Sequence, residues 1–495
     1  MHRNPAQASS DRDTSRRPRR FGRRVLVILL ACCLAMSAWQ VFKPLPPGIG
    51  TAFDIRSAHD VALLTDITYL DAAGVRHSEQ QVFDEILRLV AQARHAIVLD
   101  MFLFNDFAGA DAAAPLRPLS AQLTQALVAR KQALPGLQVV VITDPINTLY
   151  GGTRSRHLDA LRQAGVEVVV TDLARLRAPN PAWSGFWQLC CRWLGNDDEG
   201  GWLPSPFGGD KVTLRTYLAL LNLNANHRKT LVVDEGAQWT AVVASANPHD
   251  GSSAHGNVAL RFSGPAAADL LRSERAVVEI SDARWTLSEP PAAAARDSDG
   301  ATRMQLLTEG RIRDALLAGL EGAKAGEQLD IAVFYFSHRA LVKAVVAAQR
   351  RGVRLRVLLD PNEDAFGRKK NGIPNRQVAL ELHEAGVPVR WCDTHGEQCH
   401  AKFMLRRSAD GSAELIAGSA NYTRRNLDDY NLETSARLLA PTDAPVMARA
   451  SAYFDQSWGN TQGRGISLPY AAFEDTSRWR YWRYRFTEAT GFSSF

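Results

Sequence analysis

The sequence predicts an α/β protein built from two tandem α/β/α sandwich halves, with an apolar segment in front of them. Two observations predict the halves: short apolar strands alternate with amphipathic helices, and similar blocks of sequence recur in the same order in both parts of the chain. A third predicts the leading segment, since an apolar run of 18 residues follows an arginine-rich tail. The expected boundaries are 1–24 for the tail, 25–42 for the apolar segment, 61–288 for the first half, 289–303 for a linker, 304–462 for the second half and 463–495 for a C-terminal aromatic and basic segment.

The apolar run at 25–42 predicts a single membrane-spanning helix, because 18 residues are just long enough to cross a bilayer. Positive charge in front of a span favours a cytosolic N-terminus, so the rest of the chain is expected outside the cytosol, in the periplasm. A cleavable signal peptide is the alternative, because Ala35-Met-Ser37 resembles a cleavage site. The protein would then be secreted.

Charge is concentrated in the tail. Residues 1–24 carry eight arginines and two aspartates, and their net charge of +6 equals that of the whole chain. The remainder is balanced, so composition does not indicate the basic face that a general nucleic-acid-binding protein needs.

The first repeated block is an apolar strand. Residues 97–104 follow an amphipathic helix that a Ser78-x-x-Gln81 capping box is expected to open. Their counterpart in the second half is the apolar run 329–336.

Two further blocks recur downstream of these strands. The apolar run that ends at Asp144-Pro corresponds to the run that ends at Asp360-Pro, and each is expected to be a strand that proline stops. Gly165 and Gly386 each follow an amphipathic stretch and precede a strand, which is typical of a glycine that caps a helix. The shared order predicts one topology for both halves.

The most informative repeat combines two short motifs. His227-Arg-Lys229 is followed by Ser245-Ala-Asn247, and His400-Ala-Lys402 is followed by Ser419-Ala-Asn421 at nearly the same spacing. Histidine can attack or protonate, lysine can hold an anionic oxygen as a point charge, and asparagine can donate a fixed amide hydrogen bond. Duplicated, this set suits a phosphodiester.

The paired motifs and the Asp-Pro strands resemble the phospholipase D superfamily over about residues 60–460. The resemblance implies two halves related by a pseudo-twofold axis, with one active site at their shared face. It implies a phosphodiesterase or phosphatidyltransferase, such as a cardiolipin synthase, and we expect neither a metal nor a cofactor. The residues it implies are His227, Lys229, Asn247, His400, Lys402, Asn421 and Glu433 as catalytic groups, Ser245 and Ser419 as substrate-binding groups, and Asp234 as a structural residue of the first motif.

Charge counting indicates the reaction. A phosphodiester carries one negative charge and its five-coordinate transition state approaches two, which Lys229 and Lys402 would meet. One histidine attacks phosphorus while the other protonates the leaving oxygen, and the roles then reverse with water or an alcohol as acceptor. The sequence favours His400 as the nucleophile, since Glu433 is expected to orient its ring.

The sequence departs from the family's pattern at two places. The second motif has Arg407 where an aspartate is usual, with Asp410 three residues further along. In the first half, Asn257-Val-Ala259 stands where the counterpart of Glu433 is expected, and Asp250 is a candidate substitute. One histidine is therefore expected to have a carboxylate partner and the other an amide.

The first half is longer by about 43 residues, because Asp144 and Asp360 are 216 residues apart whereas His227 and His400 are 173 apart. We place the extra residues in an insertion at 173–220. Its tryptophans and phenylalanine suit a membrane interface or the cover of an acyl-binding groove, and a packed lid is equally compatible.

Two other segments leave alternatives open. Cys392 and Cys399 flank a short loop before His400 and predict either a disulfide bond that stiffens the catalytic strand or free thiols. Arginine and aromatic residues alternate in 478–486, which predicts either a half-buried edge strand or a surface-seeking segment.

Three functions are compatible with these residues. The first is a membrane-tethered phospholipase D or phosphatidyltransferase that cleaves glycerophospholipids through a phosphohistidine, with phospholipid and the membrane surface as partners. The second is an extracytoplasmic nuclease or exonuclease of the same superfamily, whose partner is nucleic acid. The third is a non-catalytic binding module, which the intact histidines and lysines argue against. Head group, acceptor and oligomeric state are not determined by the sequence.

Overall fold

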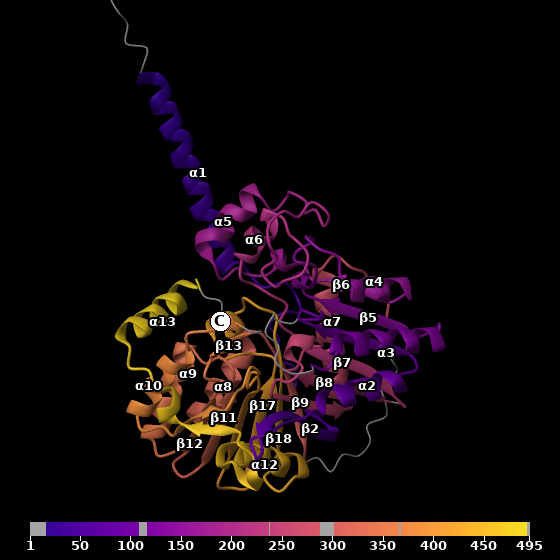
Figure 1. Ribbon diagram of the computed structural model, residues 1–495, viewed down its shortest axis with the longest axis vertical. Coiled ribbons are helices and arrows are strands. Elements are labelled where there is room, and N and C mark those ends of the chain that lie inside the picture. Colours follow the sequence, from indigo (N-terminus) through magenta and orange to yellow (C-terminus); the bar gives the residue numbers. More distant parts are fainter. Residues whose placement is uncertain (1–15, 108–115, 237, 288–300, 366–367, 493–495) are drawn as a thin grey trace, which may run out of the picture.

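The computed structural model describes residues 16–107, 116–236, 238–287, 301–365 and 368–492. Helix α1 (Arg16–Phe42) projects from the body of the protein (Figure 1), and its stretch Phe21–Phe42 is long and apolar enough to cross a membrane. The helix begins inside the predicted arginine-rich tail, whose residues 1–15 lie outside the described part. The predicted linker 289–303 also lies outside it, apart from its last three residues.

The first half is built on an eight-stranded mixed sheet in the order β3-β2-β9-β8-β7-β4-β5-β6, in which β4, β5 and β6 run parallel. Its strands are β2 (His59–Leu70), β3 (Arg76–Glu79), β4 (Ala96–Met101), β5 (Gln138–Thr143), β6 (Glu167–Val170), β7 (Lys229–Glu235), β8 (Gln238–Ala244) and β9 (Asn257–Ser263). Its helices are α2 (Val82–Gln92), α3 (Leu119–Ala133), α4 (Arg156–Gln163), α5 (Pro181–Cys190), α6 (Leu214–Leu220) and α7 (Pro265–Ile280), with short 3-10 turns at Pro145–Thr148, Leu173–Arg175 and Asp250–Ser252.

The second half is built on a nine-stranded sheet in the order β1-β10-β18-β17-β16-β11-β12-β15-β19. Its strands are β1 (Arg56–Ser57), β10 (Arg303–Thr308), β11 (Gln328–Val333), β12 (Arg354–Leu359), β15 (Val389–Cys392), β16 (Lys402–Arg407), β17 (Ser412–Gly418), β18 (Thr434–Pro441) and β19 (Ser467–Pro469), and a separate ribbon pairs β13 (Asp364–Ala365) with β14 (Arg368–Lys369). Its helices are α8 (Gly310–Gly322), α9 (Arg339–Arg350), α10 (Asn375–Glu384), α11 (Arg424–Leu427), α12 (Pro445–Gly459) and α13 (Arg478–Thr490), with 3-10 turns at Thr461–Gly463 and Tyr470–Phe473.

The two sheets pack against each other through β8 and β9 of the first half and β16, β17 and β18 of the second. One hydrophobic core crosses the boundary and joins Val98 and Phe262 to Phe403 and Leu415. A second core lies between the sheet of the second half and its outer helices, and a third lies between the sheet of the first half and its outer helices. The predicted α/β class with two tandem halves is confirmed, and the boundary between the halves is a packed interior.

The repeated blocks occupy equivalent places in the two sheets. The runs 97–104 and 329–336 correspond to β4 and β11. In its own sheet, each of these strands pairs on one side with the strand that ends at Asp-Pro and on the other side with the strand that begins at the lysine of the motif. Gly165 and Gly386 have φ angles of 79° and 80°, the left-handed conformation that a glycine helix cap adopts. Both predictions are confirmed.

The predicted capping box is wrong. Ser78 lies in β3 and bonds to Thr68, and Gln81 makes no side-chain cap at the start of α2. Asp66 on the neighbouring strand β2 takes that role, because its Oδ1 accepts from the N–H groups of Gln81 (2.8 Å) and Val82 (3.0 Å). A tertiary contact thus replaces the local one.

Two expectations about the ends of the halves also change. The segment 478–486 is helical, not a strand, because it forms most of α13. Two strands of the second sheet come from outside the predicted second half. β1 precedes the first half in sequence and pairs with β10, whereas β19 belongs to the predicted C-terminal segment and pairs with β15. Edge strands far apart in sequence complete this sheet, which local patterns cannot indicate.

Candidate active site

The two motif histidines lie where the halves meet, just before β7 and β16. Backbone hydrogen bonds cross the boundary in a reciprocal pattern: the N–H of His227 donates to the carbonyl of Leu432 (2.9 Å), and the N–H of His400 donates to the carbonyl of Gly256 (2.7 Å). Leu432 directly precedes Glu433, whose side chain faces the ring of His227. Gly256 directly precedes Asn257, whose side chain faces the ring of His400. The halves therefore assemble one site, as the repeated motifs predict.

The ring partners are crossed between the halves. His227 Nδ1 lies 2.8 Å from Glu433 Oε1, and His400 Nδ1 lies 3.2 Å from Asn257 Oδ1. The expectation of one carboxylate and one amide is confirmed. The expectation that Glu433 serves His400 is wrong, because the strand that carries the partner in each half passes behind the histidine of the other half.

The surroundings of the partners determine which ring nitrogen is free. Asn257 Nδ2 donates to the carbonyl of His255 (3.0 Å) and to Asp66 Oδ2 (3.3 Å), so its Oδ1 faces His400 and accepts from it. Although burial opposes ionisation of Glu433, its histidine and lysine neighbours lower the pKa of this carboxyl, and it accepts from His227. Both rings then donate from Nδ1 and keep Nε2 free for a substrate.

Lys229 and Lys402 are buried beside the histidines. Lys229 Nζ donates to the carbonyl of His227 (2.6 Å), and Lys402 Nζ donates to the carbonyl of His400 (2.7 Å). Burial lowers the pKa of Lys229 to about 7 although nearby carboxylates oppose the shift, and burial together with Lys229 lowers the pKa of Lys402 well below its ordinary value. A bound anion would restore both charges, so the pair suits a negatively charged group.

Each histidine–lysine pair packs against one phenylalanine. The ring centroid of Phe102 lies 4.8 Å from that of His227 and 4.9 Å from Lys229 Nζ. Phe334 repeats the arrangement at 5.1 Å from His400 and 5.4 Å from Lys402 Nζ. The two phenylalanines stand at matched positions of the repeated runs 97–104 and 329–336, and this match is the signal that could have indicated them from the sequence.

Two aspartates hold the residue before each histidine. Asp144 Oδ2 accepts from the N–H of Asn226 (2.7 Å), and Asp360 Oδ2 accepts from the N–H of Cys399 (2.8 Å). Burial raises the pKa of both aspartates to about 7, and these backbone donors oppose the shift. From the sequence, both aspartates are predicted only as strand ends, although the repetition of Asp-Pro ahead of each His-x-Lys motif is a signal for a further role.

Two asparagines hold the phenylalanines in the same way. Asn147 Nδ2 donates to the carbonyl of Phe102 (2.8 Å), and Asn375 Nδ2 donates to the carbonyl of Phe334 (2.7 Å). Asn147 follows its Asp-Pro closely whereas Asn375 follows after a longer loop, so the match is hidden in the sequence.

The two motif asparagines border the same site. Asn247 Oδ1 accepts from the N–H of Leu103 (3.3 Å), the residue that follows Phe102 just after the end of β4. Within the described ranges, Asn421 is 5% exposed and its Oδ1 has no hydrogen-bond partner. Both positions are compatible with the expected catalytic role.

The two motif serines lie deeper than expected. Ser245 Oγ donates to Asn257 Oδ1 (3.0 Å), Ser419 Oγ donates to Glu433, and neither serine is exposed. Because each serine supports the residue behind a histidine, the structure indicates a positioning role and not the substrate-binding role that the resemblance implies.

Arg228, between His227 and Lys229, joins the site to both halves. Its buried guanidinium lies 2.9 Å from Glu309 of the second half and 3.5 Å from Glu274 of the first. Glu309 Oε1 also accepts from the N–H of Glu433 (3.0 Å). One carboxylate therefore holds both the motif strand and the partner of its histidine, and no short-range pattern could have indicated it.

Asp234 Oδ1 accepts from the N–H of Ala96 (2.8 Å) at the start of β4, a contact that is compatible with the expected structural role. At the corresponding strand end of the second half, Arg407 donates to Asp330 of β11 (2.7 Å), so the carboxylate stands on the neighbouring strand. Asp410 is exposed and its Oδ1 accepts from the N–H of Ser412, the first residue of β17 (2.9 Å). Asp250 does not substitute for Glu433, because it accepts from the N–H of Ser120 (2.9 Å) in α3.

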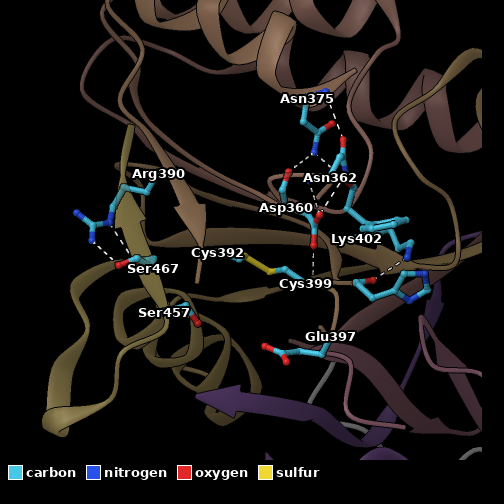
Figure 2. The surroundings of a disulfide bond; sticks show 12 residues. Asp360, Asn362, Asn375, Arg390, Cys392, Glu397, Cys399, Lys402, Ser457 and Ser467 are labelled. Carbon is cyan, nitrogen blue, oxygen red and sulfur yellow. Dashed lines mark hydrogen bonds between the residues drawn. A yellow bond between two sulfur atoms is a disulfide. The ribbon is translucent and has the colours of Figure 1, made fainter. Parts of the chain in front are cut away.

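Figure 2 shows a disulfide bond beside the second motif. Cys392 at the end of β15 is bonded to Cys399, which confirms the disulfide alternative over free thiols. Asp360 also accepts a hydrogen bond from the N–H of Cys399. The residue directly before His400 is therefore fixed through both its side chain and its backbone. A second disulfide joins Cys190 and Cys191 at the end of α5, and Cys32 and Cys33 of α1 are free.

The insertion 173–220 packs against α1, with α5 beside the base of that helix (Figure 1). Gly185 permits the close approach, because a Cβ there would lie 2.5 Å from the carbonyl oxygen of Cys33. Directly after α1, Lys43 Nζ donates to the carbonyl of Ala174 (2.7 Å). The base of α1 is therefore fixed to the first half.

The aromatic residues of the insertion divide between two environments. Trp187 is buried and Trp183 Nε1 donates to the carbonyl of Leu218 (2.8 Å), whereas Phe186 and Trp193 are exposed. The lid and the membrane-interface interpretations each describe one face of the segment. A cavity of about 430 Å³ lies beneath it, and none of the motif histidines and lysines lines this cavity.

The fold and the site define a class of protein: a tandem α/β chain with one composite site of two histidines and two lysines at the boundary of its halves. Residues 317–458 match a family model described as cardiolipin synthase, PLD-like domain. The second half of the chain is therefore similar to the PLD-like domain of this family.

Individual proteins are also similar to this chain. Mitochondrial cardiolipin hydrolase of Xenopus laevis is 29% identical over 143 residues, which are 29% of this chain and 59% of that protein. The same enzyme of Xenopus tropicalis is 30% identical over 136 residues, or 27% of this chain and 56% of that protein. The chain thus spans little more than half of these curated relatives. The crystal structure of phosphatidylserine synthase of Haemophilus influenzae Rd KW20 has a similar fold, with a TM-score of 0.53 at 10% identity over 88% of this chain and 94% of that one.

Proposed function

We propose that this protein is a membrane-anchored phosphodiesterase that cleaves glycerophospholipids, or transfers their phosphatidyl group, through a phosphohistidine. The observation that carries the proposal is the composite site itself. Two histidines with free Nε2 atoms and two buried lysines meet at the boundary of the halves.

In the proposed mechanism, His227 is the nucleophile. Its Nε2 lone pair attacks phosphorus, and the bond between phosphorus and the leaving oxygen breaks with its electron pair on that oxygen. His400, initially protonated, gives this oxygen its Nε2 proton. Lys229 and Lys402 stabilise the added negative charge. Water or an alcohol then gives a proton to neutral His400 and displaces His227 from phosphorus.

The unequal partners support these roles, which reverse the assignment favoured by the sequence. The carboxylate of Glu433 stabilises positive charge on the ring that bonds to phosphorus, whereas the neutral amide of Asn257 leaves protonated His400 a stronger acid. Burial lowers the pKa of His227 to about 4, and Glu433 opposes the shift. In the free site, burial and Lys402 lower the pKa of His400 well below its ordinary value, so the proposed acid role requires the negative charge of the bound phosphodiester to keep this ring protonated.

Features outside the site support a lipid substrate. Helix α1 is long and apolar enough to anchor the protein in a membrane, and the insertion beside it exposes Phe186 and Trp193. The curated relatives are named as cardiolipin hydrolases. With the N-terminus in the cytosol, the catalytic body would face the periplasm, and cleavage of α1 would instead release it.

Product analysis tests the substrate class. The full-length protein is incubated in nanodiscs of mixed phospholipids, with single-stranded DNA as the competing substrate, and products are identified by mass spectrometry. We expect phosphatidic acid, or a new phosphatidyl ester when an alcohol is added. Faster cleavage of DNA than of every phospholipid would favour the nuclease alternative.

Two histidine variants test the mechanism. We expect His227→Ala and His400→Ala each to lower turnover by at least about a hundredfold. Intact-mass analysis of the quenched wild-type enzyme should locate the phosphoryl adduct on His227. An adduct on His400 would reverse the roles, and high residual activity in either variant would contradict a composite site.

Exposed aromatic residues of the insertion test the role of the membrane. Phe186→Ser with Trp193→Ser should lower activity on vesicles several-fold more than activity on a soluble phosphodiester. Val75→Ser, at an exposed apolar residue between β2 and β3, is the matched control. Equal losses on both substrates would contradict interfacial binding by this segment.

A further inference from the structure

Helix α13 (Arg478–Thr490) exposes three large aromatic residues. Trp479 is 76% exposed, Trp482 65% and Phe486 64%. Their spacing of three and four residues places them on one face of the helix. A contiguous apolar stripe of this kind on a folded protein usually marks an interaction surface.

The opposite face holds α13 firmly on the second half. Tyr484 is fully buried, and its hydroxyl donates to the carbonyl of Ser337 (2.9 Å). Glu488 lies one turn further on and accepts from Ser337 Oγ (2.7 Å). Because these contacts fix the rotation of the helix, the aromatic stripe cannot turn toward the core.

Arginines lie on both sides of the stripe. Arg478 and Arg485 lie on one side and Arg483 on the other, as 3.6 residues per turn requires. Within the described part of the chain, neither Arg478 nor Arg483 has a carboxylate partner, whereas Arg480 pairs with Asp475 (3.0 Å). A stripe of tryptophans flanked by unpaired arginines is typical of a helix that lies in the interface of a bilayer.

The end of α13 touches the part of the protein that carries the anchor. Gly491, directly after the helix, lies so close to the carbonyl of Pro179 that no side chain fits there. Pro179 lies two residues before the start of α5, which packs on α1. The C-terminal end of the helix that carries the aromatic stripe therefore lies near the base of α1 (Figure 1).

We propose that α13 is an interfacial helix that lies on the membrane entered by α1. Trp479, Trp482 and Phe486 enter the boundary between head groups and acyl chains, and Arg478 and Arg483 bind lipid phosphates. Together with α1, this second contact holds the body at one orientation to the bilayer. The proposal rests on the proposed membrane location but not on the catalytic mechanism.

Site-specific photocrosslinking in cell membranes tests the proposal. Full-length protein carries p-benzoylphenylalanine in place of Trp482, or separately in place of Trp479, and intact-mass analysis identifies what is attached after irradiation. Ala448 is the control position, because it is exposed on α12 at the opposite end of the molecule from α1 (Figure 1).

We expect phospholipid adducts at positions 479 and 482 and none at 448. Arg483→Gln should lower the share of anionic lipid among the adducts about fivefold, the effect of one arginine near a charged membrane. Adducts to a second copy of the chain or to another protein, or no lipid adduct at either position, would overturn the proposal. The same spectra report whether α1 is retained, so failure of the anchor is distinguishable from failure of the α13 contact.

Discussion

Lys229 and Lys402 are buried lysines, one from each half, at the proposed reaction centre. Burial lowers the pKa of Lys229 to about 7, so the free enzyme loses this charge as the pH rises through neutrality. A bound anion reverses the shift, and binding must then take up protons. The rate and the protonation of this site are therefore coupled near neutral pH.

The first prediction is that kcat/KM for a soluble phosphodiester falls as the pH rises above about 7, not near the ordinary lysine value. Sulfate keeps its charge in this range, and calorimetry in buffers of different ionisation enthalpy should show more proton uptake on sulfate binding at about pH 8 than at about pH 6. Equal uptake at both pH values would contradict the lowered pKa.

The same shift affects stability, and Lys229→Met serves as its control. Because the folded pKa lies below the unfolded one, the folded state binds fewer protons between about 7 and 10.5, so the contribution of Lys229 to stability increases as the pH rises through this window. We expect the wild type to gain more in melting temperature across it than the variant. An identical pH dependence would contradict the assignment to Lys229.

The second prediction concerns Glu433. Glu433→Gln keeps a hydrogen-bond acceptor near His227 but removes the charge that stabilises a phosphorylated ring, so we expect kcat to fall by about a hundredfold or more. Asn257→Asp is the matched variant, and we expect it to lower kcat as well, because a carboxylate behind His400 makes this ring a weaker acid. A higher rate in Asn257→Asp would contradict the proposed roles, because the new carboxylate would then be stabilising phosphorylated His400. Single-turnover rates measure both.

The third prediction is that a chelator leaves the rate on a soluble phosphodiester unchanged. Lys229 and Lys402 provide the positive charge that metal ions provide in many phosphoryl-transfer sites. A soluble substrate separates the chemistry from any effect of calcium on lipid surfaces. Activity that falls with EDTA and returns with zinc or magnesium would contradict the two-lysine mechanism.

At the scale of elements, the motif strands are positioned by what precedes them. The Cys392–Cys399 disulfide and Asp360 hold the entry to β16, and Asp144 holds the entry to β7. The second entry therefore has a covalent support that the first lacks.

The fourth prediction is that Cys392→Ser with Cys399→Ser lowers the free energy of unfolding by about 2 kcal/mol, the value for a short closed loop. Turnover should fall as well, because Cys399 precedes His400. Cys190→Ser with Cys191→Ser is the control, since that bond lies at the end of α5 and far from the motif in sequence. Chemical denaturation and a soluble substrate measure both effects, and equal loss of turnover in the two double variants would contradict a local role.

At the scale of the whole molecule, the halves function as one body. The core that joins Val98 to Phe403 crosses the boundary, and Arg228 of the first half pairs with Glu309 of the second. Catalytic geometry and the stability of the interface therefore depend on the same contacts.

The fifth prediction is that Glu309→Gln lowers the free energy of unfolding by about 3 kcal/mol, as expected when one partner of a buried ion pair is removed. Activity should fall further than stability alone explains, because Glu309 also holds the backbone of Glu433. Glu321→Gln on the exposed face of α8 is the control. A variant with full activity and reduced stability would show that Glu309 has a structural role alone.

Much of this protein is determined by its sequence read in order. The alternation of strands and helices, the repeated blocks and the two His-x-Lys motifs predicted tandem α/β halves with one shared site. These features depend on local periodicity and on repetition, which a single chain displays. The apolar run before the halves was visible for the same reason, since the length of a membrane span depends on composition alone.

The tertiary structure alone decided which groups meet. Glu433 faces His227 and not His400, Asp66 caps α2 in place of Ser78, and 478–486 is a helix because Tyr484 docks on the second half. Each of these outcomes depends on a contact between residues distant in sequence. Local patterns specify which face of an element is apolar, but the crossing of the two sheets determines which side chain lies behind which histidine.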